Sequence, residues 1–126
     1  MAPGTWHFQI ERERTGKVAV LRLIGRLGEA SAHLLREALE VPEEIGVVVD
    51  LGALDYISGA GLDVLDQAAH IAAKGGRRFV LCGLQGSVRI AFDLAGLSGR
   101  LTVESNRERA LTTAAGHLPP SATRGS

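Results

Sequence analysis

The sequence is poor in aromatic residues and contains a single cysteine. Aromatic side chains make up 4% of the 126 residues, so a buried core must consist mainly of Val, Leu, Ile and Ala. The lone Cys82 excludes an internal disulfide framework and a metal site built from several cysteines. One cysteine also fits a reducing compartment such as the cytosol.

Net charge and long apolar runs are also missing. The 14 Lys and Arg residues balance the 14 Asp and Glu residues, whereas a nucleic-acid-binding domain usually carries a basic excess. The longest apolar runs, Val18–Ile24 with Arg22 inside it and Ile45–Val49, have the length of a strand, and a membrane-spanning helix needs about 20 apolar residues. The first residues do not combine a charged segment with an apolar block, as a signal peptide would. We therefore expect a soluble cytoplasmic protein that neither binds nucleic acid nor inserts into a membrane.

The apolar pattern alternates between strand and helix periods. Residues 6–13 alternate apolar and polar side chains, as a half-buried strand does, and Val47–Val49 is typical of a strand covered on both faces. Gly25 is expected to close the second strand. Pro42 is expected to end the first helix, because proline cannot continue the helical hydrogen-bond ladder. The expected strands are 6–13, 18–24, 45–51, 79–82 and 101–103, and the expected helices are 30–41, 61–74, 87–95 and 107–115.

This order, β-β-α-β-α-β-α-β-α, predicts an α/β fold with a mixed, mostly parallel β-sheet flanked by helices. Alternating strands and helices give parallel strands joined by right-handed crossovers, while the opening hairpin makes the first strand antiparallel. We expect one domain over residues 5–115. Residues 116–126 have little to bury and are expected to form a flexible tail.

Five enzyme-like sites can be tested against the sequence, and each lacks a required element. A tyrosine-phosphatase loop needs a shorter spacing than the six residues between Cys82 and Arg89. The stretch Gly59–Gly61 lacks the third glycine of a dinucleotide-binding loop. Asp50 has no acidic pair at the ends of the first strands with which to hold Mg²⁺, the four histidines match no zinc spacing, and Ser58 lacks the glycines of a nucleophile elbow. We therefore predict a protein that is not an enzyme and has no metal or cofactor.

The segment Val47–Leu65 carries the clearest signal. A buried strand is expected to end at Asp50-Leu51, a loop follows, and a helix begins just after Ser58. The first N–H groups of a helix have no intrahelical partner, so a phosphate on Ser58 would meet the positive end of the helix and add roughly −1.5 to −2 charges. The simpler interpretation is that Ser58 caps the helix and that the glycines allow a tight turn.

This segment, VVVDLGALDYISGAGLDVL, resembles the signature of the STAS-domain anti-sigma factor antagonists. In that family a strand ending in Asp-Leu leads through an aromatic or apolar pair into Asp/Ser-Ser-Ser/Ala-Gly-Leu. The resemblance covers about residues 5–115, nearly the whole chain. The other stretches that match in order and spacing are Val20–Gly25 with residues 30–32, Arg78–Gly83, and Val88–Leu97 with Leu101–Leu111.

The resemblance implies a protein-binding switch without catalytic activity. Members bind an anti-sigma factor, often a serine protein kinase of the GHKL type, and so release a sigma factor. The kinase phosphorylates a Ser or Thr in the signature loop, and a phosphatase, in some systems of the PP2C type, resets the switch. Aligned on Gly61-Leu62, the usual acceptor falls on Gly59 or Ala60, which carry no hydroxyl, and Ser58 stands one position earlier. Gly28 likewise stands where many relatives carry Asp.

Three hypotheses stay open. Ser58 is a shifted phospho-acceptor, or the loop is a docking surface that is never phosphorylated. In the third, the chain is a soluble STAS subunit of an ABC-type lipid transporter or a scaffold complex, and the same surface docks an ATPase subunit.

The predicted partner surface joins two loops, because the carboxyl ends of parallel strands meet at one edge of a sheet. The first helical turn, with Asp63, is expected to lie beside them. The first loop contributes Arg26, Leu27, Gly28 and Glu29, and the second contributes Asp55, Tyr56, Ser58, Gly59, Ala60 and Gly61.

Overall fold

The chain opens with the predicted antiparallel hairpin. β1 (Phe8–Thr15) pairs with β2 (Val18–Leu27), and Gly16 between them has a φ of 61°, a left-handed conformation that favours glycine. The computed structural model describes residues 8–40 and 45–116. Trp6 and the expected tail from residue 117 onward therefore lie outside the described residues.

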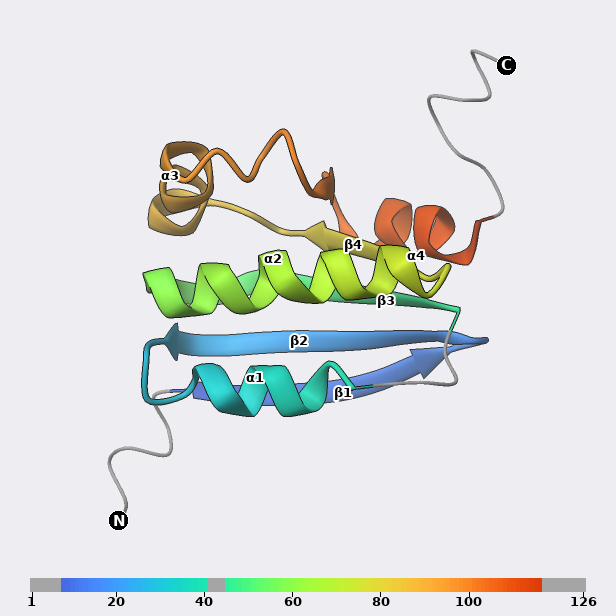
Figure 1. The fold of residues 1–126 in the computed structure, drawn as a ribbon, viewed down its shortest axis with the longest axis horizontal. Coiled ribbons are helices and arrows are strands. Elements are labelled where there is room, and N and C mark those ends of the chain that lie inside the picture. The colour runs from blue at the N-terminus through green and yellow to red at the C-terminus, as the bar shows by residue number, and fades with distance from the viewer. Residues whose placement is uncertain (1–7, 41–44, 117–126) are drawn as a thin grey trace.

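The rest of the chain alternates helices with strands, as the periodicity predicts (Figure 1). The sheet order is β1-β2-β3-β4-β5, and every pair from β2 to β5 is parallel. The predicted α/β order is thus confirmed. The elements after the hairpin are α1 (Ala32–Ala38), β3 (Gly46–Ile57), α2 (Gly59–Lys74), β4 (Arg78–Cys82), α3 (Gly86–Leu94), β5 (Thr102–Glu104) and α4 (Arg107–Ala115).

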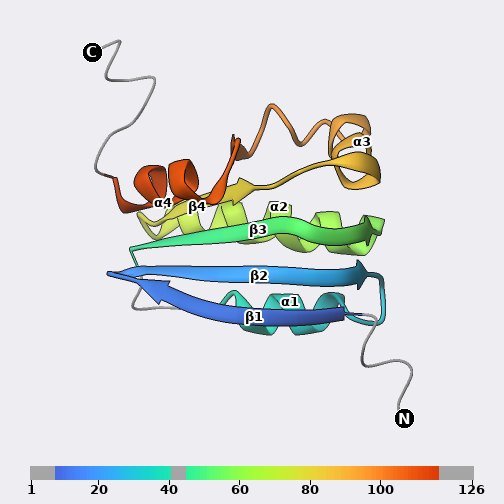
Figure 2. The same cartoon turned by 180° about the vertical axis from the view of Figure 1, so that it is seen from behind.

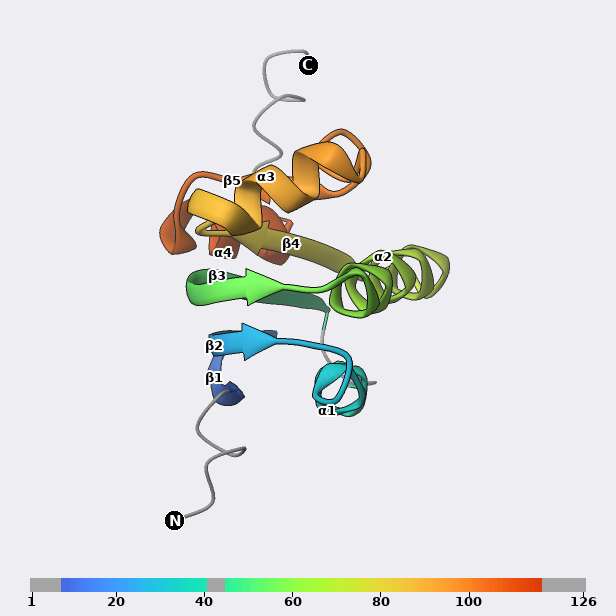
Figure 3. The same cartoon turned by 90° about the vertical axis from the view of Figure 1, so that its left-hand side faces the viewer.

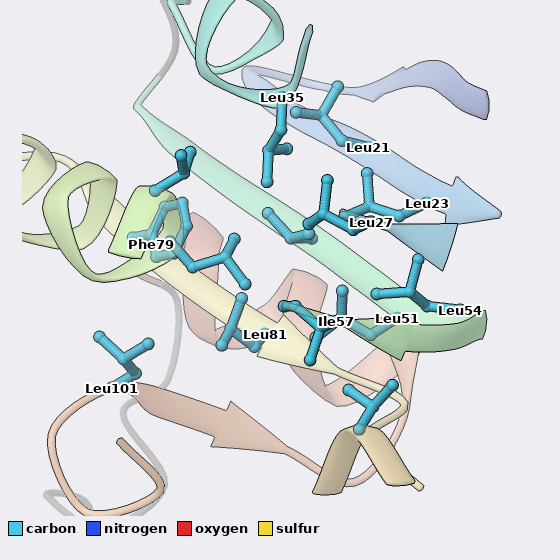
Figure 4. Packing of buried hydrophobic residues seen from close by; sticks show 14 of the residues in the cluster. Leu21, Leu23, Leu27, Leu35, Leu51, Leu54, Ile57, Phe79, Leu81 and Leu101 are labelled. Atoms are coloured by element: carbon cyan, nitrogen blue, oxygen red, sulfur yellow. The ribbon is translucent and has the colours of Figure 1, made fainter. Parts of the chain in front are cut away.

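Helices cover both faces of the sheet (Figures 2 and 3). α1 and α2 lie on one face, and α4 lies on the other. Side chains alternate along a strand, so neighbouring residues of β3 enter different cores: Val49 packs with α1 and α2, whereas Val48 packs with α4. Leucine is the commonest residue of the larger core, which includes Leu21, Leu23, Leu27, Leu35, Leu51, Phe79 and Leu81 (Figure 4).

β2 and β3 run several residues further than the sequence predicts, and β1 and β5 end one or two residues later than expected. Gly25 does not close β2, which continues to Leu27, and β3 continues past Leu51 to Ile57. The register between β2 and β3 shifts twice, between Arg22 and Ile24 and between Gly25 and Arg26. Such irregularities let paired strands continue through a glycine, which is why reading Gly25 as a breaker was wrong.

The helix boundaries differ by a few residues. α1 ends at Ala38, with Leu39 as its C-cap, so it ends before Pro42, and Pro42 itself lies outside the described residues. α2 begins at Gly59, two residues before the predicted start, because Ser58 already provides its N-cap.

Candidate functional site

The ends of β2 and β3 meet the start of α2 at one edge of the sheet (Figures 1 and 3). Leu27 pairs with Ile57 across the two strands. The backbone N–H of Ser58 donates a 2.8 Å hydrogen bond to the carbonyl oxygen of Leu27. The predicted first loop and the predicted signature loop are therefore fixed to each other through the backbone.

Ser58 caps α2 with its side chain. Its Oγ accepts a hydrogen bond from the backbone N–H of Gly61 at 3.2 Å, which satisfies one of the unpaired donors of the first turn. Only 9% of Ser58 is exposed. The one hydroxyl at the helix start is thus both buried and engaged.

Two glycines at the start of α2 differ in their surroundings. A Cβ on Gly61 would lie 2.9 Å from side-chain atoms of Ile57 and Leu27, closer than real contacts allow. A Cβ on Gly59 would meet nothing within 4 Å. The helix approaches the strand ends closely because residue 61 is glycine, whereas position 59 opens to solvent.

Arg26 and Tyr56 form a contact that the sequence prediction missed. They are register partners on β2 and β3, and the guanidinium carbon of Arg26 lies 4.4 Å from the centroid of the Tyr56 ring. This is a cation–π distance. Tyr56 remains 38% exposed, so the stacked pair forms part of the surface.

The turn after β2 folds on itself. The backbone N–H of Gly28 donates to Ser31 Oγ at 3.1 Å, and the backbone N–H of Ser31 donates to the carbonyl oxygen of Gly28 at 3.2 Å. A Cβ on Gly28 would meet nothing within 4 Å. Space therefore exists for the Asp that the family resemblance places at this position.

Side chains at the start of α3 donate hydrogen bonds to the backbone of β3. Ser87 Oγ donates to the carbonyl oxygen of Asp55 at 2.8 Å, and Gln85 Nε2 donates to the carbonyl oxygen of Gly52 at the same distance. α3 presents two exposed apolar side chains four residues apart, Ile90 and the 84% exposed Leu94. The sequence prediction did not place them at the surface, although their helical spacing could have indicated a common face.

Asp50 forms hydrogen bonds with residues outside the predicted partner surface. Its Oδ2 accepts from Arg107 Nη2 at 3.1 Å and Nε at 3.3 Å, and its Oδ1 accepts from the backbone N–H of Gly52 at 2.9 Å. Arg107 also bonds Glu13 at 2.9 Å. Asp50 therefore links β3 to α4 and β1, and it does not mark the end of a strand as the sequence suggested.

Cys82 lies against α4 with 1% of its surface exposed. Burial, together with the negative charge of Asp50, raises the pKa of its thiol from 9.0 to about 11. Such a thiol stays protonated at neutral pH and is a poor nucleophile.

The structure brings the predicted partner residues to one surface, with two corrections. Arg26 and Leu27 end β2, and Asp55 and Tyr56 lie on β3, so none of them is in a loop. Asp63 is exposed in the second turn of α2, not the first, because the helix starts at Gly59. Of the remaining predicted residues, Glu29 and Gly59 are exposed, Gly28 and Ala60 are half-buried, and Ser58 and Gly61 are buried.

Within residues 8–40 and 45–116, no cluster of three His, Cys, Asp or Glu side chains could hold a metal ion. No helix in this part of the chain is long and apolar enough to cross a membrane. His33 and His70 lie exposed on helices α1 and α2.

Comparison with known proteins gives a consistent result. A family model described as the STAS domain matches residues 9–110. A curated relative is BtrV of Bordetella bronchiseptica, named as a candidate anti-sigma factor antagonist. It is 36% identical over 100 residues, which span 77% of this chain and 86% of BtrV.

Solved structures share the fold at lower identity. An anti-sigma factor antagonist from Mycobacterium paratuberculosis has a TM-score of 0.78 at 21% identity, over 86% of this chain and 94% of that one. The anti-sigma factor antagonist SpoIIAA in its unphosphorylated form has a TM-score of 0.71 at 19% identity, over 86% and 96%. A sulfate transporter family protein from Wolinella succinogenes has a TM-score of 0.70 at 18% identity, over 82% and 88%. At these identities the likeness concerns the fold alone.

Proposed function

The chain belongs to the STAS domain family, and we propose that it acts as an anti-sigma factor antagonist. The name of its relative BtrV supports this function. The observation that carries the proposal is the bond between Ser58 N–H and the Leu27 carbonyl, which holds two segments as one surface. This docking surface consists of Arg26, Gly28 and Glu29 at and just after the end of β2, Asp55 and Tyr56 near the end of β3, and Gly59, Ala60 and Asp63 in α2. The buried Ser58 and Gly61 hold the start of α2 beneath it.

The partner is an anti-sigma factor of the serine-kinase, GHKL-type class that the family resemblance implies. Binding occupies the anti-sigma factor and frees a sigma factor for transcription in the cytoplasm. The domain, which we assign to residues 5–115, contributes a surface and no catalytic residue. Docking surfaces commonly depend on a few aromatic and arginine side chains, and the stacked Arg26 and Tyr56 supply both types here.

The docking surface works without phosphorylation of Ser58. Ser58 Oγ is buried and accepts the cap bond from Gly61, so a kinase would have to displace this bond and expose the hydroxyl to reach it. Of the two positions on which the family acceptor falls, Gly59 is open and Ala60 is half-buried, and neither has a hydroxyl. On this proposal the chain is a constitutive antagonist that needs no PP2C-type phosphatase to reset it.

Intact-mass measurement with the cognate kinase and ATP tests this point. The wild-type chain should gain no phosphate. Gly59→Ser places a hydroxyl at the open position, so this variant should gain one, which shows that the kinase is active and docked. A phosphate on the wild-type chain that disappears in Ser58→Ala would instead make Ser58 a shifted acceptor.

Affinity purification from the chain's own cells tests the partner. A copurifying GHKL-type kinase supports the proposal. Its loss in Tyr56→Ala, with retention in Arg22→Gln, a variant outside the docking surface, would place it on that surface. Copurifying transporter ATPase subunits would replace the proposal with the lipid-transport hypothesis.

A further inference from the structure

β1 forms one edge of the sheet (Figure 2). Within residues 8–40 and 45–116 it pairs with β2 alone, and the strand at the opposite edge, β5, has only 3 residues against 8 in β1. A free edge presents unpaired backbone N–H and C=O groups to a strand of another chain. β1 is therefore the edge at which a second copy of this chain could most readily extend the sheet.

The charged residues of β1 are sorted by sign between the two faces of the sheet. β1 pairs with β2 in one unbroken register, so its side chains alternate between the faces. Ile10 packs against the larger core on the face that α1 and α2 cover, and Arg12 and Arg14 lie on that same face. Glu13 forms an ion pair with α4 on the opposite face, and Glu11 shares that face.

A two-fold dimer would preserve this sorting. Two-fold dimers are the commonest homo-oligomers, and in them the same surface of each copy meets itself. Around such an axis, two β1 strands paired edge to edge run antiparallel, and each face of one sheet continues into the same face of the other. Side chains that lie directly opposite each other then come from one face. An arginine of one copy therefore never lies directly opposite a glutamate of the other, in any register.

The two registers that pair the most residues of β1 bring like charges together. With Arg12 on the axis, the two Arg12 side chains meet, and Glu11 lies opposite Glu13 of the second copy. With Glu11 on the axis, the two Glu11 side chains meet. Like charges directly opposite each other destabilise a strand pair. The register with Ile10 on the axis avoids such contacts, but it pairs fewer residues of β1.

Arg12 contributes most to this repulsion. It is exposed and makes no ion pair within the described part of the chain. Glu11 and Glu13, in contrast, form ion pairs with arginines of β2 and α4. The charge of Arg12 is thus uncompensated near the middle of the edge, where the axis of a symmetric strand pair would pass.

We propose that the charge pattern of β1 closes this edge of the sheet to a second copy of the chain. Charged side chains are one of the means by which proteins protect a free strand edge from pairing. The proposal does not rest on the proposed function, because β1 supplies no residue of the docking surface.

Sedimentation equilibrium of the wild-type chain and of Glu11→Gln/Arg12→Gln tests the proposal. The double variant removes every like-charge contact from the two long registers, so it should dimerise at least about tenfold more tightly than the wild-type chain. Arg89→Gln/Glu108→Gln makes the same two changes at exposed positions of α3 and α4. This control should sediment as the wild-type chain does.

Hydrogen exchange locates the contact. In the dimer of the double variant, the amides of β1 should exchange more slowly than in the monomer, while those of β5 and α3 should not change. A wild-type dimer with protected β1 amides would overturn the proposal. So would a double variant that remains as monomeric as the wild-type chain, or one that dimerises without protecting β1.

Discussion

Arg26 stacks on Tyr56 where β2 and β3 end, with the guanidinium carbon 4.4 Å from the ring centroid. The two residues are register partners, so the sheet itself holds the arginine over the ring. A cation–π pair at an exposed site contributes about 0.5–1 kcal/mol. The stack therefore favours one orientation of two exposed side chains.

The first prediction concerns this pair. Arg26→Gln and Tyr56→Leu should each lower the free energy of unfolding slightly, and a double-mutant cycle should give a coupling of about 0.5–1 kcal/mol. Each change should weaken binding of the anti-sigma factor by more than tenfold, about 1.4 kcal/mol. Urea unfolding measures the first quantity and calorimetric titration measures the second. Full retention of binding in both variants would move the docking surface elsewhere.

The Arg26–Tyr56 pair also shows what could not be predicted from the sequence. The order of strands and helices follows from apolar periodicity, and it was predicted from runs such as Val47–Val49. The last residues of β2 and β3 are expected in loops, because Gly25 is expected to close the second strand and the apolar run of the third ends at Leu51. The strands continue there because they pair with each other through two register shifts, and pairing between distant segments cannot be read from local pattern.

The sequence predicts where the candidate site lies but not how its residues pack. The signature residues fixed the position of Ser58 just before α2, which the structure confirms. Burial of Ser58 and the close approach of Gly61 to Leu27 and Ile57 depend on how α2 packs on the strand ends. Such packing is a tertiary property that single-sequence patterns do not encode.

The second prediction separates a capping role of Ser58 from a phosphorylation role. Ser58→Ala removes the acceptor for Gly61 N–H and should lower the free energy of unfolding by about 1 kcal/mol. Ser58→Asp keeps an oxygen acceptor at the positive helix end and should recover most of this loss. Thermal and urea unfolding of the three proteins provide the measurement.

Partner binding by these Ser58 variants gives the control. If Ser58 only caps the helix, Ser58→Asp should bind the anti-sigma factor nearly as well as the wild-type chain. If phosphorylation of Ser58 releases the partner, the added negative charge should instead abolish binding.

The third prediction uses the two glycines at the start of α2. Gly61→Ala forces a Cβ to within 2.9 Å of Leu27 and Ile57, and such overpacking should cost about 1–3 kcal/mol of stability. Gly59→Ala meets open space and should be neutral or stabilise by up to about 1 kcal/mol, because alanine favours helix over glycine. Equal effects of the two changes in urea unfolding would contradict the close packing of Gly61.

The fourth prediction concerns Asp50, which joins β3 to Arg107 of α4. Its side chain is 17% exposed. Asp50→Asn should therefore lower the free energy of unfolding by about 1.5–3 kcal/mol, the range for hydrogen bonds to charged groups. Arg22→Gln breaks the more exposed pair between Arg22 and Glu11 and should change stability by less than about 1 kcal/mol. Partner binding should survive both changes, because neither residue lies on the docking surface.

The fifth prediction is a pH dependence that originates at Cys82. Burial and the charge of Asp50 raise the pKa of the thiol from 9.0 to about 11, so the folded state holds this proton more tightly than the unfolded state does. The resulting stability is fully present below the unfolded value near 9 and is lost as the pH rises through about 11. The loss cannot exceed about 3 kcal/mol, since one pKa unit corresponds to about 1.4 kcal/mol.

Comparison with Cys82→Ala isolates this contribution from the other groups that titrate at alkaline pH. The variant should be less stable than the wild-type chain at neutral pH, because it leaves a small cavity against α4. Between pH 9 and 11 the wild-type chain should lose more stability than the variant, so the two urea-unfolding curves plotted against pH should converge. Parallel curves across this range would mean that the thiol ionises equally well in both states, and Cys82 would then have to be accessible to water in the folded chain.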